Sequence, residues 1–307
     1  MKVEKWIDQN IPSLQGKRIL ITGANSGIGF EAAKIFASKE AELLMACRNA
    51  NRAEKAKEEI LSLYPKTKIT ILSYDQSSFE SIDGCVSSII QQFDSIDVVV
   101  CNAGIYHPEK HLTTKDGFPL TIGTNYIGCY YFVEKLRPFL EKNPNGRIIF
   151  VSSLIYKTRK KINTDVLTMT EEHATESYKA SKIAIGKYFS TLISKTPLCV
   201  LMMHPGVSST NIYSSTNSHF PRWFMALAHR VLPIFTHSPK KACLGIVLLA
   251  SQKNVTSGTI LGPRGLGEWS GFPKKRKLPK WHLQDAEEFV SFTKNLIKKK
   301  EEEIKHA

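Results

Sequence analysis

The 307 residues, 42% hydrophobic and 9% aromatic, suffice for a large buried core, and no apolar run reaches the roughly 18 residues that a membrane-spanning helix needs. The polar first 16 residues are unlike a secretory signal, and six scattered cysteines without a Cys-x-x-Cys pair favour a cytoplasmic protein with reduced thiols and no metal site. The net charge of +14 favours anionic partners, but the basic clusters at 157–161 and 274–277 are not interleaved with aromatic side chains, so no nucleic-acid partner is expected.

Short apolar strands alternate with helical patterns from residue 18 to about residue 262. The expected strands cover residues 18–22, 41–46, 68–72, 98–101, 147–151, 198–203 and 259–261, and the expected helices cover residues 31–39, 51–63, 79–93, 121–140 and 238–251, with a further helix that carries Tyr178 and ends near residue 194. The strand at 98–101 is continuously apolar, as in a parallel strand covered on both faces. The alternation predicts a single Rossmann-type, doubly wound α/β domain with a parallel sheet of about seven strands and helices on both faces.

A glycine-rich turn, Thr22-Gly-Ala-Asn-Ser-Gly-Ile-Gly29, lies between the first expected strand and the first expected helix. In this context glycines let the backbone approach a pyrophosphate, and the helix N-terminus offers it unpaired N–H groups. An ordinary strand–helix turn is the alternative. We expect a dinucleotide to contact this turn, at Gly23, Asn25, Ser26, Gly27, Ile28 and Gly29.

Arg48 follows the second expected strand, where an NAD site usually places an acid for the ribose 2′-hydroxyl. No acid lies between Met45 and Ala53, and an arginine here accommodates a 2′-phosphate instead. Arg52 could assist, although it is expected on the exposed first turn of a helix. The sequence therefore favours NADP(H) over NAD(H).

Tyr178 and Lys182 are four residues apart, so they share one face if this segment is helical. A nearby ammonium lowers the pKa of a phenol, and such a pair can give a proton to a carbonyl oxygen or take one from an alcohol. The spacing alone carries little weight, because Tyr-x-x-x-Lys occurs five times in the chain. Only Tyr178 follows a strand ending in serines and opens a helix that leads to a Pro-Gly turn.

Taken together and in this order, the motifs resemble those of the short-chain dehydrogenase/reductase family, from residue 17 to about residue 273. The resemblance implies that Asp75 contacts adenine and that Asn102, Ala103 and Gly104 form the family's Asn-Asn-Ala-Gly motif, in which Cys101 replaces the first asparagine. It further implies that the Pro-Gly turn after His204 closes on the nicotinamide carboxamide, through Pro205, Gly206 and Thr210.

The resemblance also implies a catalytic set of Asn125, Ser153, Tyr178 and Lys182. In this family the tyrosine gives a proton to the carbonyl oxygen, the serine holds that oxygen, and the lysine lowers the pKa of the tyrosine and bonds the nicotinamide ribose. The asparagine helps to hold a water that leads from the lysine to solvent. Ser152 is expected to be a structural residue at the strand end.

Ser153 and Tyr178 are 25 positions apart, which exceeds the common family spacing. This insertion at 154–174 resembles the branch that contains retinol dehydrogenases and light-independent relatives of protochlorophyllide reductase. Residues 1–273 are expected to form the cofactor-binding domain, including a substrate lid at about 207–237. Residues 274–307 are expected to form a basic tail with an amphipathic helix.

We therefore expect an NADP-dependent oxidoreductase, with Tyr178 as general acid and base. The apolar side chains at 220–235 favour a hydrophobic carbonyl or alcohol substrate. The same side chains could instead cap the core, meet a second subunit in a homodimer or, less favoured, touch a membrane surface. An NADP(H)-binding regulator on the same fold is the alternative function, against which the complete catalytic set argues.

Overall fold

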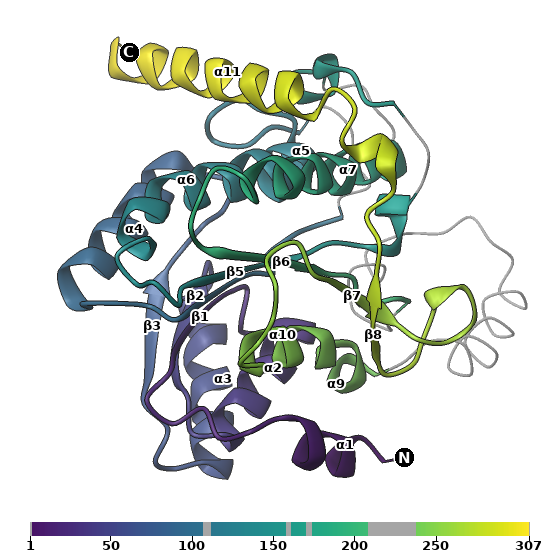
Figure 1. Cartoon of the computed structure of the whole chain (residues 1–307). Coiled ribbons are helices and arrows are strands. Elements are labelled where there is room, and N and C mark those ends of the chain that lie inside the picture. The colour runs from purple at the N-terminus through teal and green to yellow at the C-terminus, as the bar shows by residue number, and fades with distance from the viewer. Residues whose placement is uncertain (1, 107–111, 158–160, 170–173, 208–237, 307) are drawn as a thin grey trace, which may run out of the picture.

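The computed structural model describes residues 2–106, 112–157, 161–169, 174–207 and 238–306. Within these residues a sheet of eight strands runs in the order β3-β2-β1-β4-β5-β6-β7-β8 (Figure 1). The strands are β1 (Arg18–Thr22), β2 (Glu42–Cys47), β3 (Ile69–Ser73), β4 (Val98–Cys101), β5 (Arg147–Val151), β6 (Cys199–Met203), β7 (Ile260–Pro263) and β8 (Pro273–Arg276). Strands β1 to β7 pair in parallel, which confirms the predicted doubly wound α/β fold, and β8 adds an antiparallel edge.

Helices cover both faces of the sheet (Figure 1). One face carries α1 (Val3–Asn10), α2 (Gly27–Ser38), α3 (Ala50–Leu63), α9 (Pro239–Ala242) and α10 (Leu244–Ser251). The other face carries α4 (Phe79–Gln92), α5 (Leu120–Ile122), η1 (Gly123–Gly128), α6 (Cys129–Leu140) and α7 (Ala174–Leu192), with α11 (Ala286–His306) packed on α7 as an outer layer.

Each central strand supplies two hydrophobic cores, because successive side chains of a strand point to opposite faces. In β1, Ile19 and Ile21 belong to the core beneath α2 and α10, whereas Leu20 belongs to the core beneath α4, α6 and α7. All three side chains have no exposed surface. This double burial is why the strands are continuously apolar in sequence rather than alternating.

The helix expected at 121–140 is interrupted in the structure. The turns of η1, Gly123–Gly128, have the wider π-helical spacing, and they lie between α5 and α6. A Cβ atom on Gly128 would lie 1.8 Å from the Gln76 carbonyl oxygen, so the helix passes directly against the chain that follows β3. Such π-turns are frequent at functional sites, and this one carries Asn125.

The residues after 273 join the sheet and its helical layer. Residues 273–276 form β8 on the free edge of β7, and the expected amphipathic helix is present as α11. Phe289 of α11 is buried in the core, and the Thr293 and Tyr126 hydroxyl groups lie 2.9 Å apart in a hydrogen bond. The 3-10 turns η2 (Leu154–Lys157), η3 (Thr164–Leu167), η5 (Leu266–Glu268) and η6 (Lys280–His282) complete the described elements.

Among the described helices, none combines the length and the apolar character needed to cross a membrane. All six cysteines lie in described segments and are free thiols, and Cys199 is the one that is not fully buried.

Candidate active site

The predicted site residues gather at one edge of the sheet. The sequence reverses direction across the sheet between β1 and β4, since β2 and β3 lie on one side of β1 and β4 to β7 on the other. In an open α/β sheet this switch point, at the carboxyl ends of the strands, is where ligands bind. Gly23, Arg48, Asn102, Ser152 and His204 each directly follow the last residue of a strand, so they share this edge.

The glycine turn after β1 is shaped by close backbone contacts. Gly23 and Gly27 have left-handed φ angles of 68° and 56°, which favour glycine. A Cβ atom on Gly23 would lie 3.1 Å from the Ala103 Cα atom, and one on Gly29 would lie 2.5 Å from the Gly23 carbonyl oxygen. Ala24 and Ile28 are buried, so the turn is anchored to the core on either side of its exposed residue, Ser26.

Asn102 fastens this turn to the end of β4. Its Nδ2 donates to the carbonyl oxygens of Thr22 at 2.9 Å and Gly23 at 3.2 Å. The Thr22 Oγ1 in turn accepts from the backbone N–H groups of Asn102 and Ala103, at 3.0 and 2.9 Å. Two neighbouring strand ends are thereby held in one rigid unit.

Arg48 and Asp75 lie on the β2 and β3 side of the turn. Arg48 is exposed immediately after β2, and the next residue, Asn49, caps α3 by accepting a hydrogen bond from the Arg52 N–H group. Asp75 is half-buried, and its Oδ1 accepts from the backbone and hydroxyl of Ser77 at 3.0 and 2.6 Å. Asn25, within the turn itself, is also partly exposed.

Tyr178 and Lys182 share one buried face of α7, as the spacing predicts. Tyr178 is 8% exposed and Lys182 is 7% exposed. The Lys182 Nζ lies 5.7 Å from the centre of the Tyr178 ring and donates to the Val151 carbonyl oxygen at 3.2 Å. Burial lowers the pKa of Lys182 to about 8. The ring of Tyr106 meets Tyr178 edge-on at 5.6 Å.

Asn125 connects this face of α7 to the chain after β4. Its Nδ2 donates to the Ile105 carbonyl oxygen at 2.8 Å, and its Oδ1 accepts from the Ile105 N–H group at 2.7 Å. The same Nδ2 lies 3.2 Å from the Ser181 hydroxyl, beside Lys182. A Cβ atom on Gly104 would lie 3.1 Å from Asn125 Oδ1 and 3.7 Å from Lys182 Nζ, so Gly104 leaves room for both groups.

The two serines after β5 have different environments. Ser152 is 3% exposed, and its hydroxyl has no hydrogen-bond partner among the described residues. Ser153 is half-buried, and its Oγ accepts from the Ile155 N–H group at 3.4 Å, a long contact that opens the turn η2. Because η2 packs against α7, the inserted segment begins beside the helix that carries Tyr178.

The Pro-Gly turn after β6 packs against the β7–β8 connection. Gly206 has a φ of 75°, and a Cβ atom on it would lie 2.3 Å from the Trp269 carbonyl oxygen. The Val207 N–H group donates to that same oxygen at 2.8 Å. Thr210 and residues 208–237 of the expected lid lie outside the described residues.

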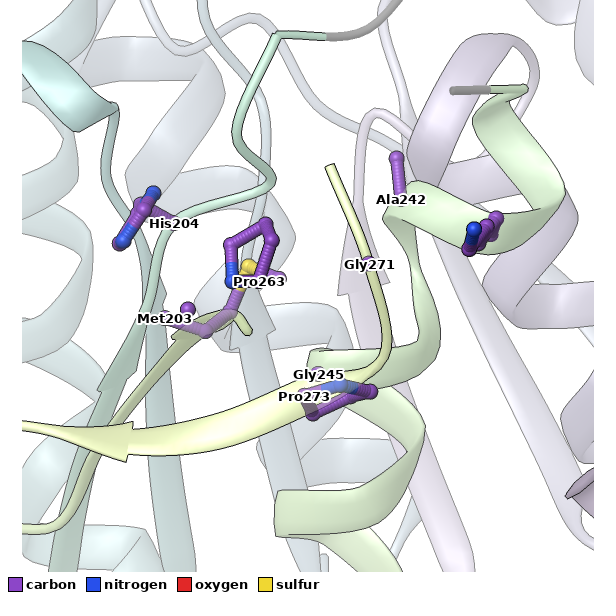
Figure 2. A pocket seen from close by; sticks show the side chains of 9 residues that line it. Met203, His204, Ala242, Gly245, Pro263, Gly271 and Pro273 are labelled. Atoms are coloured by element: carbon purple, nitrogen blue, oxygen red, sulfur yellow. The ribbon is translucent and has the colours of Figure 1, made fainter. Parts of the chain in front are cut away.

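A small pocket is lined by residues at the end of β6, from β7 and β8, and from the helices α9 and α10 (Figure 2). Met203, His204, Gly245, Pro263 and Gly271 are among its lining residues. None of Asn125, Ser153, Tyr178 and Lys182 contributes to the lining. The pocket is thus separate from the proposed proton-transfer groups.

Two residues that hold segments of the site in place, Gln76 and Glu268, were not predicted from the sequence. Gln76 is buried, and its Nε2 donates to the carbonyl oxygens of Ala103 at 3.1 Å and Thr124 at 2.7 Å, which holds the chain after β4 against η1. Glu268 accepts at the Pro-Gly turn from His204. Neither residue belongs to a pattern in the sequence, since both act across long chain separations.

No cluster of three or more His, Cys, Asp or Glu side chains suited to a metal occurs in the described part of the chain.

Comparison with protein families matches residues 17–220 to the short chain dehydrogenase model. The chain is 30% identical over 249 residues to the chicken (Gallus gallus) WW domain-containing oxidoreductase, covering 78% of this chain and 59% of that protein. It is 28% identical over 242 residues to human retinol dehydrogenase 13, covering 78% of this chain and 73% of the relative. The match therefore spans less than two thirds of the chicken protein.

Solved structures share the fold. A crystal structure of an uncharacterized protein from Mycobacterium paratuberculosis aligns with a TM-score of 0.71 at 25% identity, over 94% of this chain and 96% of that one. The Brucella melitensis 3-ketoacyl-(acyl-carrier-protein) reductase in complex with NADH gives 0.61 at 23% identity, over 81% and 96%. L-sorbose reductase from Gluconobacter frateurii, in complex with NADPH and L-sorbose, gives 0.61 at 20%, over 80% and 92%.

Proposed function

The chain belongs to the short-chain dehydrogenase family, and from that membership we propose that it transfers a hydride between NADP(H) and the carbonyl or alcohol carbon of a hydrophobic substrate. The observation that carries this proposal is the pair of Tyr178 and Lys182 on one buried face of α7, with the Lys182 Nζ 5.7 Å from the tyrosine ring. A charged ammonium there favours the phenolate that remains when Tyr178 gives up its proton.

Lys182 supplies this charge at neutral pH. Its pKa is lowered to about 8 by burial, so the protonated form still predominates at pH 7. The hydrogen bond to the Val151 carbonyl oxygen holds the ammonium at the end of β5, beside the serines. Tyr178 then donates its proton to the carbonyl oxygen in reduction, and takes one from the alcohol in oxidation.

Ser153 and Asn125 complete the proposed catalytic set. Ser153 directs its hydroxyl to the substrate oxygen and stabilises the charge that develops there, since its contact with Ile155 N–H is long and easily exchanged. Asn125 acts indirectly, because its amide is occupied by both backbone groups of Ile105. It fixes the chain after β4 next to Lys182 and supports a water path from that lysine to solvent.

The turn after β1 fits a dinucleotide pyrophosphate. The positions where Cβ atoms would fill the cradle are glycines, and the Ser26 side chain makes no cap bond to the first-turn N–H groups of α2, which leaves them to an anion. When bound, NADPH supplies the hydride. Arg48, exposed beside this turn, would hold the 2′-phosphate, and Asp75 would contact the adenine. Asn102, Ala103 and Gly104 would also contact the cofactor, and Pro205 and Gly206 would close on the nicotinamide.

The proposed substrate class rests on two observations. The residues at 220–235 are rich in large apolar side chains, and human retinol dehydrogenase 13 is among the relatives. Neither identifies one compound. A hydrophobic aldehyde, ketone or alcohol is the chemistry common to both.

Turnover of the purified chain tests this function. NADPH consumption is measured against a panel of aldehydes, ketones and quinones, in the wild type and in Tyr178→Phe. We expect the variant to lose turnover by at least about a hundredfold, because the proton donor is gone, while NADPH binding followed by fluorescence is unchanged. Tyr64→Phe is the matched control, because Tyr64 also precedes a lysine by four positions and lies away from the site. Full turnover by Tyr178→Phe would reject the proton-donor role, and cofactor binding without turnover on any substrate would favour a regulator.

A further inference from the structure

A cluster of charged and polar side chains surrounds Glu268, which the proposed mechanism does not use. Glu268 ends η5 in the connection between β7 and β8. Its Oε2 lies 2.8 Å from the Nε2 of His204, and its Oε1 contacts the Nζ of Lys157 and lies 3.1 Å from the Nη1 of Arg276. The Glu268 side chain is 12% exposed and that of His204 is fully buried.

The three partners come from three separate segments. Lys157 ends η2, four residues after Ser153. His204 follows β6 and directly precedes the Pro-Gly turn, and Arg276 ends β8. One carboxylate therefore joins the start of the inserted segment, the turn after β6 and the edge of the sheet.

The backbone beside Glu268 is fastened to the same turn. The Val207 N–H group donates to the Trp269 carbonyl oxygen, and Gly206 has no room for a Cβ atom against it. Glu268 itself has a φ of 60°, a left-handed conformation that residues other than glycine seldom adopt. The backbone conformation at position 268 therefore favours glycine. Compared with glycine, a glutamate at this position adds the contacts of its carboxylate.

The protonation states are consistent with a fixed arrangement. Burial lowers the pKa of His204 to about 4, so this imidazole is uncharged at neutral pH. A carboxylate can only accept hydrogen bonds, so the Nε2 atom of His204 carries the proton and donates it to Glu268. Burial acts to raise the pKa of Glu268, but the hydrogen bonds from Lys157 and His204 together lower it below its ordinary value, so the carboxylate stays ionised.

We propose that Glu268 is a positioning residue for the nicotinamide half of the cofactor site. This inference rests on the proposed function. The glycine turn lies at the centre of the sheet, Arg48 and Asp75 lie on the side of β2 and β3, and the Glu268 cluster lies on the side of β6 to β8. A dinucleotide bound across the switch point thus has its two halves on different sides. Glu268 holds the Pro-Gly turn in place for the nicotinamide half of the dinucleotide, and not for the adenine half.

Two ligands separate this role from a general structural one. NADP⁺ has both halves, whereas 2′-phospho-ADP-ribose keeps the phosphates and adenine and lacks the nicotinamide. In Glu268→Ala we expect NADP⁺ affinity to fall by about tenfold, as for the loss of hydrogen bonds to a charged group, while affinity for the fragment stays within about twofold. The kcat for reduction falls as well. Glu268→Gln keeps an acceptor for His204 and should lose less.

Further variants test whether Glu268→Ala acts only by disturbing its loop, and replace it if it does not fold. Leu266→Ala changes a 98% exposed side chain on the same turn and should alter neither affinity. Should Glu268→Ala not fold, Lys157→Met removes one partner of the carboxylate and should weaken NADP⁺ selectively, whereas Lys161→Met, an exposed lysine of the same segment, should not.

The outcomes are distinct. Selective loss of NADP⁺ affinity supports the positioning role. Equal loss for both ligands, or no loss for either, overturns it. Binding of neither ligand by the wild type overturns the proposed function, and this inference with it.

Discussion

Lys182 is charged at neutral pH although its burial disfavours the charged form. The side chain is almost completely enclosed, and its pKa is lowered from 10.5 to about 8 by loss of contact with water. A lowered lysine pKa means that the charged form is less stable in the folded protein than in the unfolded chain. The fold therefore gives up stability to hold an ammonium beside Tyr178, a cost that is expected at a functional site.

Replacing this lysine should separate stability from activity. We expect Lys182→Met to abolish turnover and to raise the free energy of unfolding at pH 7 by roughly 1–3 kcal/mol, because the buried charge is removed at the cost of one hydrogen bond to Val151. Urea unfolding measures the change. Lys179→Met, on the same helix with a half-exposed ion pair to Glu176, should stay near the wild type in both respects. A destabilised Lys182→Met would show that the charge is well solvated in the fold.

Arg48 offers a test of cofactor choice. It is exposed immediately after β2, where its guanidinium can meet a 2′-phosphate without rearrangement of the strand. We expect Arg48→Asp to shift the kcat/KM ratio of NADPH to NADH by at least about tenfold toward NADH, because attraction of the phosphate becomes repulsion. Lys57→Ala is the control, since this lysine lies farther along α3 and its Nζ pairs with Glu54. An unchanged ratio in Arg48→Asp would assign the phosphate contact elsewhere.

For individual residues, the sequence predicts which of them lie at the site better than it predicts their hydrogen-bond partners. The residues that directly follow β1, β2, β4, β5 and β6 were all singled out from the sequence, because strand ends can be read from apolar runs and glycines. The bonds of Asn102 to the glycine turn, of Gln76 to Ala103, and of Glu268 to His204 were not. Each joins residues 27 to 80 positions apart, and no local pattern encodes such a pairing. The catalytic and cofactor roles themselves stay predictions.

Among the elements, β8 and η1 differ most from expectation. Residues 273–276 carry no apolar alternation, and their basic side chains suggested a solvated tail. They form a strand because the edge of β7 supplies the backbone pairing, and lysines on an edge strand discourage pairing with another sheet. The π-turns of η1 were missed for a similar reason, since the close contact of Gly128 with Gln76 appears only in the folded chain.

The final helix, α11, is anchored by one apolar face. Phe289 is 3% exposed and its ring lies 5.8 Å from that of Tyr126, whereas Phe292 on the same helix is 41% exposed. We expect Phe289→Ala to lower the free energy of unfolding by about 3–4 kcal/mol, because it leaves a cavity between α11 and the core. Phe292→Ala should change it by less than about 1 kcal/mol. Urea unfolding compares the two, and equal effects would mean that α11 does not stabilise the fold through this face.

At the scale of the whole molecule, two buried histidines in the described part of the chain lie next to Tyr156 and are uncharged at neutral pH. The His204 and His282 rings lie 5.5 and 5.9 Å from the Tyr156 ring. His282 also donates from Nε2 to the Tyr156 carbonyl oxygen at 2.6 Å. Burial lowers both pKa values from 6.5 to about 4. Below pH 6.5 the unfolded chain takes up protons at these positions, whereas the folded protein does so only near pH 4.

Stability should therefore fall as the pH falls through this window. The unfolded state binds more protons between pH 6.5 and 4, so the free energy of unfolding decreases on acidification, by up to about 1.4 kcal/mol per pH unit for each histidine. We expect His282→Gln to be less stable than the wild type at pH 7, because the bond to Tyr156 is weakened, but to lose less stability between pH 7 and pH 4.5. Urea unfolding at several pH values measures both slopes. His306→Gln, at the exposed end of α11, should reproduce the wild-type slope. Equal slopes for the wild type and His282→Gln would mean that His282 takes up its proton as readily in the folded protein as in the unfolded chain.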